Sequence, residues 1–215
     1  MAEKLPSQLS PPQLGPPQLG ADGRIVEGII TTLGEDGSVN ISPMGPIIDS
    51  QFQQFVLRPF QTSTTYQNLK RTGQAVFHVT DDIDLIARAA LGTPHPMPAT
   101  FSARAVDGKI LSDACRWYAL KVSTLDDSQE RTCIVASCID QGRQRDFLGY
   151  NRAQHAALET AILATRIHLL PHDEILAELA RLESRVNKTA SRVEQQTFDF
   201  LRQHIESKIA AASSR

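Results

Sequence analysis

The chain has 215 residues, enough for one compact domain or for one domain with a helical appendage. Its 22 basic and 24 acidic residues give a formal net charge of -2 and form no long block of one sign, so neither a nucleic acid nor a membrane surface is an expected partner. No apolar run reaches the roughly 20 residues that span a bilayer, and the start MAEKLPSQLS lacks the apolar core of a secretory signal, so a cytoplasmic location is expected.

Residues 1–22 form a segment rich in proline and glutamine, in which PPQLG occurs twice in succession. Because proline has no backbone N–H, this composition disfavours regular hydrogen bonding. A disordered or polyproline-like tail is therefore predicted. A ligand for a proline-recognition domain is the alternative interpretation.

From Ile25 onward the pattern predicts short strands separated by turns. The first two, IVEGIITTL and SVNIS, flank the turn sequence GEDG, so they are expected to form a hairpin. The further predicted strands are Phe52–Leu57, Ala75–Thr80, Thr100–Val106, Trp117–Thr124 and Thr132–Asp140. Short strands linked in this way are typical of an antiparallel barrel.

Two short helices are predicted between these strands. The first, Thr64–Arg71, is followed by Gly73, which is suited to end it. The second, Ile83–Leu91, begins at one of two adjacent aspartates and is also followed by a glycine.

After about Asp146 apolar residues recur three and four positions apart, which predicts helices. Alanines on the first of them permit close packing against another helix, either of the same chain or of a second subunit. A second helix is expected to start at Pro171 and a third at Thr189 or Ser191. The predicted fold is thus α+β and mainly β, with a barrel domain at residues 23–145 and, at residues 146–215, a helical region that packs on the barrel or on a dimer partner.

The segment from Arg58 to Asn68, RPFQTSTTYQN, places one arginine ahead of four hydroxyl residues at a predicted helix start. Hydroxyls and free backbone N–H groups there point donors at an anion, and Arg58 can add a two-pronged charged contact. Because a phosphomonoester carries nearly two negative charges, this segment is a candidate phosphate site. The alternative is that Ser63 or Thr64 only caps the helix while Arg58 faces solvent.

A second segment, VNISPMGP at residues 39–46, ends a predicted strand with polar residues and two prolines. This composition leaves backbone groups unpaired beside an apolar surface. A planar ring that needs both stacking and hydrogen bonds at its edge can lie there.

Two of these stretches, VNISPMGP and TTYQNLKRTGQAVFHV, closely resemble the FMN-binding split barrels related to flavin reductases. More narrowly, EGIITT, NISPMGP, LRPF, STTYQNL, TGQAVFHVTDD, ARAALG and GYNRAQHAALETAILATRIHLL resemble the domain-of-unknown-function family 447. The resemblance extends from about Ile25 to Leu170 and is weaker in the C-terminal helices.

The resemblance implies a split barrel of six or more strands and a homodimer with FMN at the subunit interface. It places the phosphate contacts at the first helix, on Arg58, Ser63, Thr64, Thr65 and Asn68. It places the strand that borders the ring system at Asn40, Ile41, Ser42 and Met44. The residues alone do not decide which of Thr62, Ser63, Thr64 and Thr65 point inward, because successive side chains face opposite ways until the helix begins.

Other polar residues have a structural and a functional interpretation. Asp81, Asp82 and Asp84 can bind a divalent ion or can simply favour the start of a helix, and no metal site is predicted from them. His78 on an apolar strand is either a hydrogen-bonded core residue or a partner of the flavin. The three cysteines form no CxxC pair and are expected to be free thiols.

Three functions remain open at this point. The first is an FMN-dependent oxidoreductase of unknown substrate, in which the cofactor supplies the electron chemistry. The second is a flavin-binding sensor, carrier or assembly protein without turnover, because no dedicated acid, base or nucleophile is evident. The third is a structural dimer in which the phosphate-like segment is only a helix cap.

Overall fold

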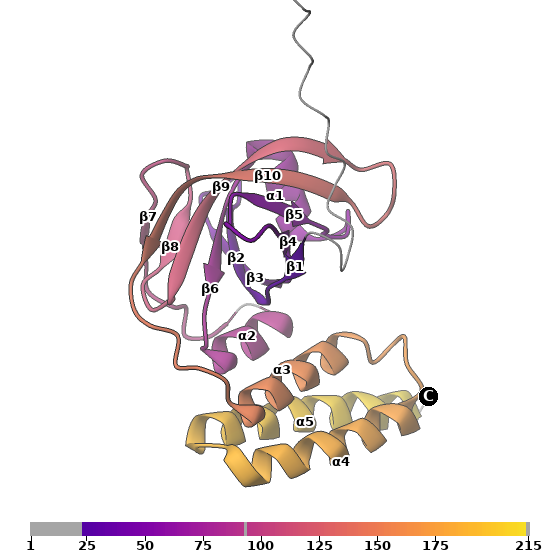
Figure 1. Cartoon of the computed structure of the whole chain (residues 1–215). Coiled ribbons are helices and arrows are strands. Elements are labelled where there is room, and N and C mark those ends of the chain that lie inside the picture. The colour runs from indigo at the N-terminus through magenta and orange to yellow at the C-terminus, as the bar shows by residue number, and fades with distance from the viewer. Residues whose placement is uncertain (1–22, 93, 214–215) are drawn as a thin grey trace, which may run out of the picture.

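The computed structural model describes residues 23–92 and 94–213. Within them, a strongly curled β-sheet lies above a layer of three C-terminal helices (Figure 1). This arrangement confirms the predicted antiparallel β architecture followed by a helical segment. The tail predicted at residues 1–22 lies outside the described residues.

The strands of the main sheet are β1 (Arg24–Ile25), β2 (Gly28–Leu33), β3 (Val39–Met44), β4 (Ile47–Ile48), β5 (Gln54–Leu57), β6 (Gln74–Val79), β9 (Arg116–Asp126) and β10 (Cys133–Arg143). In the described part of the chain they form one sheet of eight strands in the order β1-β4-β5-β10-β9-β6-β2-β3, with antiparallel neighbours. β3 therefore lies at an edge of the sheet, and one side of its backbone has no strand partner in the part of the chain that the structure describes.

A two-stranded ribbon, β7 (Thr100–Ser102) and β8 (Lys109–Leu111), covers one side of the barrel (Figure 1). The strand predicted at Thr100–Val106 is therefore too long, because the chain turns after Ser102 and pairs back on itself. β8 was not predicted, since three residues are too few to show a period of two. The hairpin predicted at the GEDG turn is confirmed as β2 and β3.

The two short helices of the barrel follow their predicted start signals. Helix α1 (Thr64–Thr72) is capped by Ser63, whose Oγ accepts a hydrogen bond from the Tyr66 N–H at 3.2 Å. It ends at Gly73, which adopts a left-handed conformation with φ 65°. Helix α2 (Ile83–Ala90) is capped by Asp82, whose carboxylate accepts from the Leu85 N–H at 2.9 Å.

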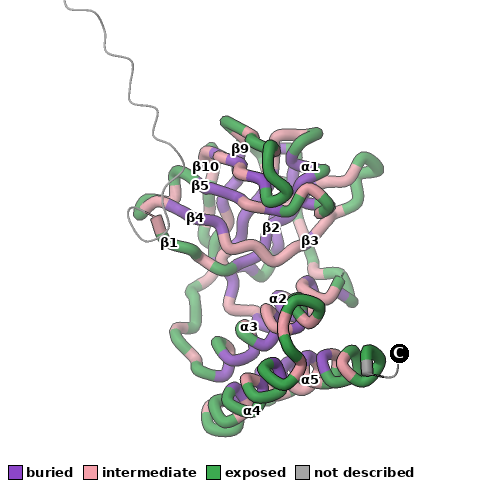
Figure 2. The backbone as a smooth tube through the Cα atoms, turned by 90° about the vertical axis from the view of Figure 1, so that its right-hand side faces the viewer, coloured by how far each residue is buried: buried purple, intermediate pink, exposed green. Residues whose placement is uncertain are grey.

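The C-terminal helices are α3 (Arg152–Thr165), α4 (His172–Thr189) and α5 (Arg192–Ser213). The predicted alanine face of α3 is buried in a core shared by all three helices, which α2 joins through Ala87 (Figure 2). Helix α4 starts directly after Pro171, and α5 follows Ser191, whose backbone N–H donates to Glu194 at 2.8 Å. The helical layer is thus attached to the barrel through α2. None of the helices between residues 23 and 213 has an apolar stretch of the length that a bilayer requires.

Candidate functional site

The predicted phosphate segment connects β5 to α1, and its arginine carries an unusual buried atom. Arg58 is half-buried, and its Nε is fully shielded from solvent without a hydrogen-bond partner among the described residues. A buried polar atom without a partner costs about 1–3 kcal/mol, more if the group is charged. Such an atom fits a site that is completed by an anion.

The hydroxyl residues after Arg58 differ in where they point. The side chains of Thr62 and Thr64 are exposed, whereas Thr65 is only 2% exposed. Ser63 is half-buried and donates from its Oγ to the Phe60 carbonyl at 2.7 Å, in addition to its role as the cap. The first two N–H groups of α1 have no partner within the helix, so they remain available to an anion together with the Thr64 hydroxyl.

Three predicted site residues are brought together around Thr32 of β2, which was not among the predicted site residues. The Thr32 Oγ1 accepts hydrogen bonds from Asn40 Nδ2 at 3.1 Å and from Asn68 Nδ2 at 3.0 Å. The Asn40 amide also donates to Thr65 Oγ1 at 3.1 Å. This network of Thr32, Asn40, Thr65 and Asn68 holds α1 against β2 and β3. Whether any of its members also contacts a ligand stays a prediction.

We expect Asn68→Ala to lower the free energy of unfolding by about 1–2 kcal/mol, because the amide is 5% exposed and its hydrogen bond to Thr32 would be lost. Urea unfolding at neutral pH measures this change. Thr64→Ala on the same helix is the matched control, and its exposed side chain predicts a change within about 0.5 kcal/mol. Equal stability of the Asn68 variant and the wild type would contradict the structural role of the network.

The segment predicted to border the ring system lies on β3, where the side chains of successive residues face opposite sides of the strand. Ile41 packs with Ile83 and Ile86 of α2, so only its backbone is available on the other side. Met44 packs against the barrel core, and Ser42 is half-buried. Because β3 is an edge strand, its outer N–H and C=O groups can serve the edge of a planar ring.

The structure adds one basic residue that sequence reasoning missed. Arg131 stands at the end of the loop that joins β9 to β10, and its Nε donates to the Arg58 carbonyl at 3.4 Å. Its guanidinium lies 5.8 Å from the centre of the Phe60 ring. An isolated arginine in a turn carries no local signal of a site, and only the pairing of Phe60 with Arg131 brings it beside Arg58.

His78 is a core residue and not a partner of a ligand. Its side chain is fully buried, its Nδ1 lies 3.2 Å from the Ile29 carbonyl, and its Nε2 accepts from the Leu111 N–H at 3.1 Å. Both ring nitrogens therefore form hydrogen bonds when the ring is the neutral tautomer that carries the proton on Nδ1. Burial lowers the pKa of His78 to about 4, so the ring is neutral at physiological pH.

The three aspartates at the start of α2 all have protein partners. Asp81 pairs with Arg145 at 2.5 Å, Asp82 caps the helix, and Asp84 pairs with Arg88 at 2.7 Å. In residues 23–92 and 94–213 no group of three or more His, Cys, Asp or Glu side chains is arranged to hold a metal ion.

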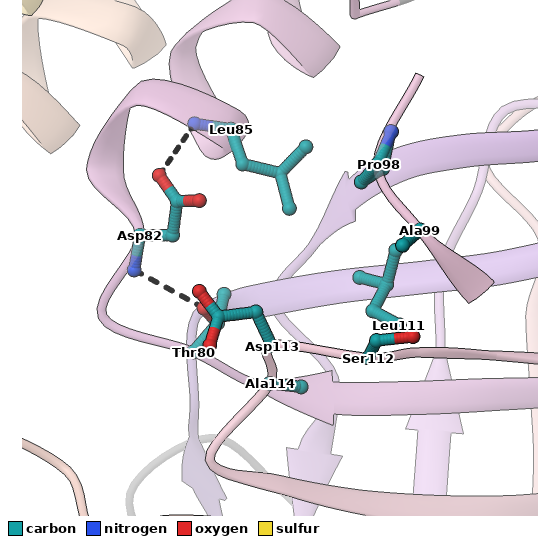
Figure 3. A pocket seen from close by; sticks show the side chains of 9 residues that line it. All are labelled: Thr80, Asp82, Leu85, Pro98, Ala99, Leu111, Ser112, Asp113 and Ala114. Atoms are coloured by element: carbon teal, nitrogen blue, oxygen red, sulfur yellow. Dashed lines mark hydrogen bonds between the residues drawn. The ribbon is translucent and has the colours of Figure 1, made fainter. Parts of the chain in front are cut away.

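A small pocket opens beside Asp82, between the β6–α2 turn and residues 111–114 (Figure 3). Its volume of about 60 Å³ is far below the roughly 300–1,000 Å³ of ligand pockets. The Asp82 backbone N–H in its wall already donates to Thr80 Oγ1 at 3.1 Å. This pocket is too small for a flavin.

Two family models match the chain. The N-terminal model of DUF447, a protein family of unknown function, matches residues 26–145, and the C-terminal DUF447 model matches residues 151–203. The chain belongs to the DUF447 family. The two matches of this DUF447 chain are separated by the segment that joins β10 to α3. No curated protein matches it.

Solved structures similar to this DUF447 chain confirm its fold. An FMN-bound DUF447 protein from Methanosarcina mazei is 21% identical, with a TM-score of 0.69 over 84% of this chain and 94% of that chain. A flavoredoxin from Methanosarcina acetivorans is 8% identical, with a TM-score of 0.50 over 58% of this chain and 72% of that chain. The predicted split-barrel fold is therefore confirmed.

Proposed function

We propose that this DUF447 protein binds FMN and that Arg58 holds the phosphate of the cofactor. The observation that carries the proposal is the buried Arg58 Nε, which has no partner among the described residues. The similar DUF447 protein from Methanosarcina mazei, which is FMN-bound, supports it. Residues 23–145 are then the flavin-binding domain, and residues 146–215 are a helical region attached to it.

The remaining predicted phosphate contacts divide into two groups by their surroundings. Thr64 and the first N–H groups of α1 are free to bind phosphate directly, while Ser63, Thr65 and Asn68 shape the helix start through hydrogen bonds within the protein. Asn40, Ile41, Ser42 and Met44 border the ring system along β3. The exposed side of the β3 backbone supplies donors and acceptors to the ring edge.

We further propose that the protein is an oxidoreductase. Bound FMN supplies the electron transfer, and the residues of this chain orient it, neutralise its phosphate and limit the access of water. The alternative is a flavin-binding sensor, carrier or assembly protein without turnover. The occupied nitrogens of His78 favour this alternative, because they remove one candidate proton donor from the barrel.

A homodimer is part of the proposal. Its support is an exposed apolar segment between β10 and α3, where Leu148 is 82% and Tyr150 is 94% exposed and Phe147 is 46% exposed. Large apolar side chains gathered on a surface in this way mark contact sites between proteins. A second copy of the chain is the partner that the proposed interfacial FMN site requires.

We expect the purified protein, saturated with FMN and passed over a sizing column, to retain flavin absorbance at the mass of a dimer. A colourless protein would contradict FMN binding, and flavin absorbance at monomer mass would contradict the dimer alone. The oxidoreductase proposal predicts that a nicotinamide or deazaflavin donor reduces bound FMN faster than free FMN. Equal rates with every donor would favour the non-catalytic alternative.

A further inference from the structure

The loop between β9 and β10 is fastened to the segment that precedes α1. The Gln61 N–H donates to the Glu130 carbonyl at 3.0 Å, and the Gln61 side chain donates to the Asp127 carbonyl at 2.7 Å. The Tyr66 hydroxyl donates to the Asp127 carboxylate at 2.6 Å, and Lys70 also contacts that carboxylate at 2.8 Å. These bonds join residues about 60 positions apart into one unit. The position of the loop relative to the helix start is therefore well defined.

This unit brings together two arginines that have no acidic partner among the described residues. Arg131 donates to the Arg58 carbonyl, and no salt bridge between described residues involves Arg58 or Arg131. Partial desolvation lowers the pKa of Arg131, and the positive charges of Arg58 and Arg166 lower it further. The positive charge of Arg58 thus acts on Arg131, and an anion that binds between two like charges relieves their repulsion.

The third positive charge comes from the helical layer. Arg166 directly follows α3, and the end of α3 lies on the same side of the molecule as the β9–β10 loop (Figure 1). Two segments distant in sequence, the end of β5 and the β9–β10 loop, thus bring positive charge together, and Arg166 adds to the positive potential at Arg131. A local potential of this kind attracts a phosphate group.

We propose that Arg131 is a second phosphate-binding residue, which together with Arg58 makes the site select FMN over unphosphorylated riboflavin. This inference rests on the proposed FMN function and adds a residue that determines specificity. A terminal phosphate carries close to two negative charges at neutral pH, so two guanidinium groups can neutralise it. Each can form charge-assisted, two-pronged hydrogen bonds with the phosphate oxygens. Riboflavin has no phosphate and gains nothing from either arginine.

The test compares dissociation constants for FMN and for riboflavin, measured by flavin fluorescence. We expect Arg131→Gln to weaken FMN binding about tenfold or more, the usual effect of losing a hydrogen bond to a charged group, and to leave riboflavin binding unchanged. Arg131→Lys keeps the positive charge but loses the two-pronged geometry of the guanidinium group. Its FMN affinity should therefore lie between those of the wild type and Arg131→Gln. Arg104→Gln is the matched control, because Arg104 is exposed in the loop between β7 and β8 on the opposite side of Figure 1.

Two outcomes of this comparison would overturn the inference. Unchanged FMN affinity of Arg131→Gln would remove Arg131 from the site while leaving the proposed FMN function intact. An equal loss for FMN and riboflavin would mean that Arg131 only supports the loop. If the wild type binds neither flavin, the proposed function fails, and inorganic phosphate becomes the probe. The anion site then predicts a phosphate-dependent rise in the unfolding temperature that Arg131→Gln abolishes, and the absence of this rise would refute it.

Discussion

Replacing Arg58 by alanine should weaken FMN binding by about 1.5–3 kcal/mol, or roughly 10- to 150-fold in the dissociation constant. The buried Nε of Arg58 has no partner among the described residues, so an anion that accepts from it gains a charged hydrogen bond in a shielded place. The same guanidinium adds charge that complements the phosphate. Fluorescence titration of the apoprotein with FMN measures the effect.

Riboflavin separates a direct contact from damage to the fold in this experiment. Loss of FMN affinity with unchanged riboflavin affinity identifies a phosphate contact, and Arg104→Ala should bind FMN as the wild type does. Arg58→Ala also removes a buried group without a partner, so the free energy of unfolding without ligand should not fall by more than about 1 kcal/mol. An unchanged FMN affinity would show that Arg58 does not hold the phosphate.

Acidification from pH 7 to pH 4 should lower the free energy of unfolding by about 3 kcal/mol through His78 alone. Burial lowers the pKa of His78 from 6.5 to about 4, so the folded state resists the proton that the unfolded chain binds below pH 6.5. The contribution of the neutral ring to stability is complete above pH 6.5 and is lost as the pH falls through about 4. The difference between the two pKa values corresponds to about 3 kcal/mol in the free energy of unfolding.

Urea unfolding of the wild type and of His78→Gln between pH 7 and pH 4 measures this effect. Glutamine does not titrate, so the variant should lose about 3 kcal/mol less than the wild type over this range, although its stability at pH 7 is lower because a buried hydrogen bond is lost. His95→Gln, at an exposed position, should follow the wild-type curve. Parallel curves for the wild type and His78→Gln would mean that His78 accepts a proton in the folded protein.

Local signals predicted most of the secondary structure. The helix predicted from the hydroxyl residues near Ser63 and from Gly73 ends within one residue of the observed end of α1. Such signals are local because a cap or a left-handed glycine acts within a single helical turn. The alanines of α3 predicted its buried face for the same reason, since the helical period places them on one side. The short strand β8 escaped prediction because its place depends on the contact of Leu111 with His78, more than 30 residues away in sequence.

The sequence by itself determined the family, most of the longer strands and the helices, and the segment from Arg58 to Asn68 in which a phosphate site is proposed. The tertiary structure decided which side chains of that segment are free. Thr65 and Asn68 point into a network with β2, and Arg131 reaches Arg58 across 73 residues of chain. The reason is physical: composition and spacing act over a few residues, whereas the register of a curled sheet sets which distant polar groups meet and which remain without a partner.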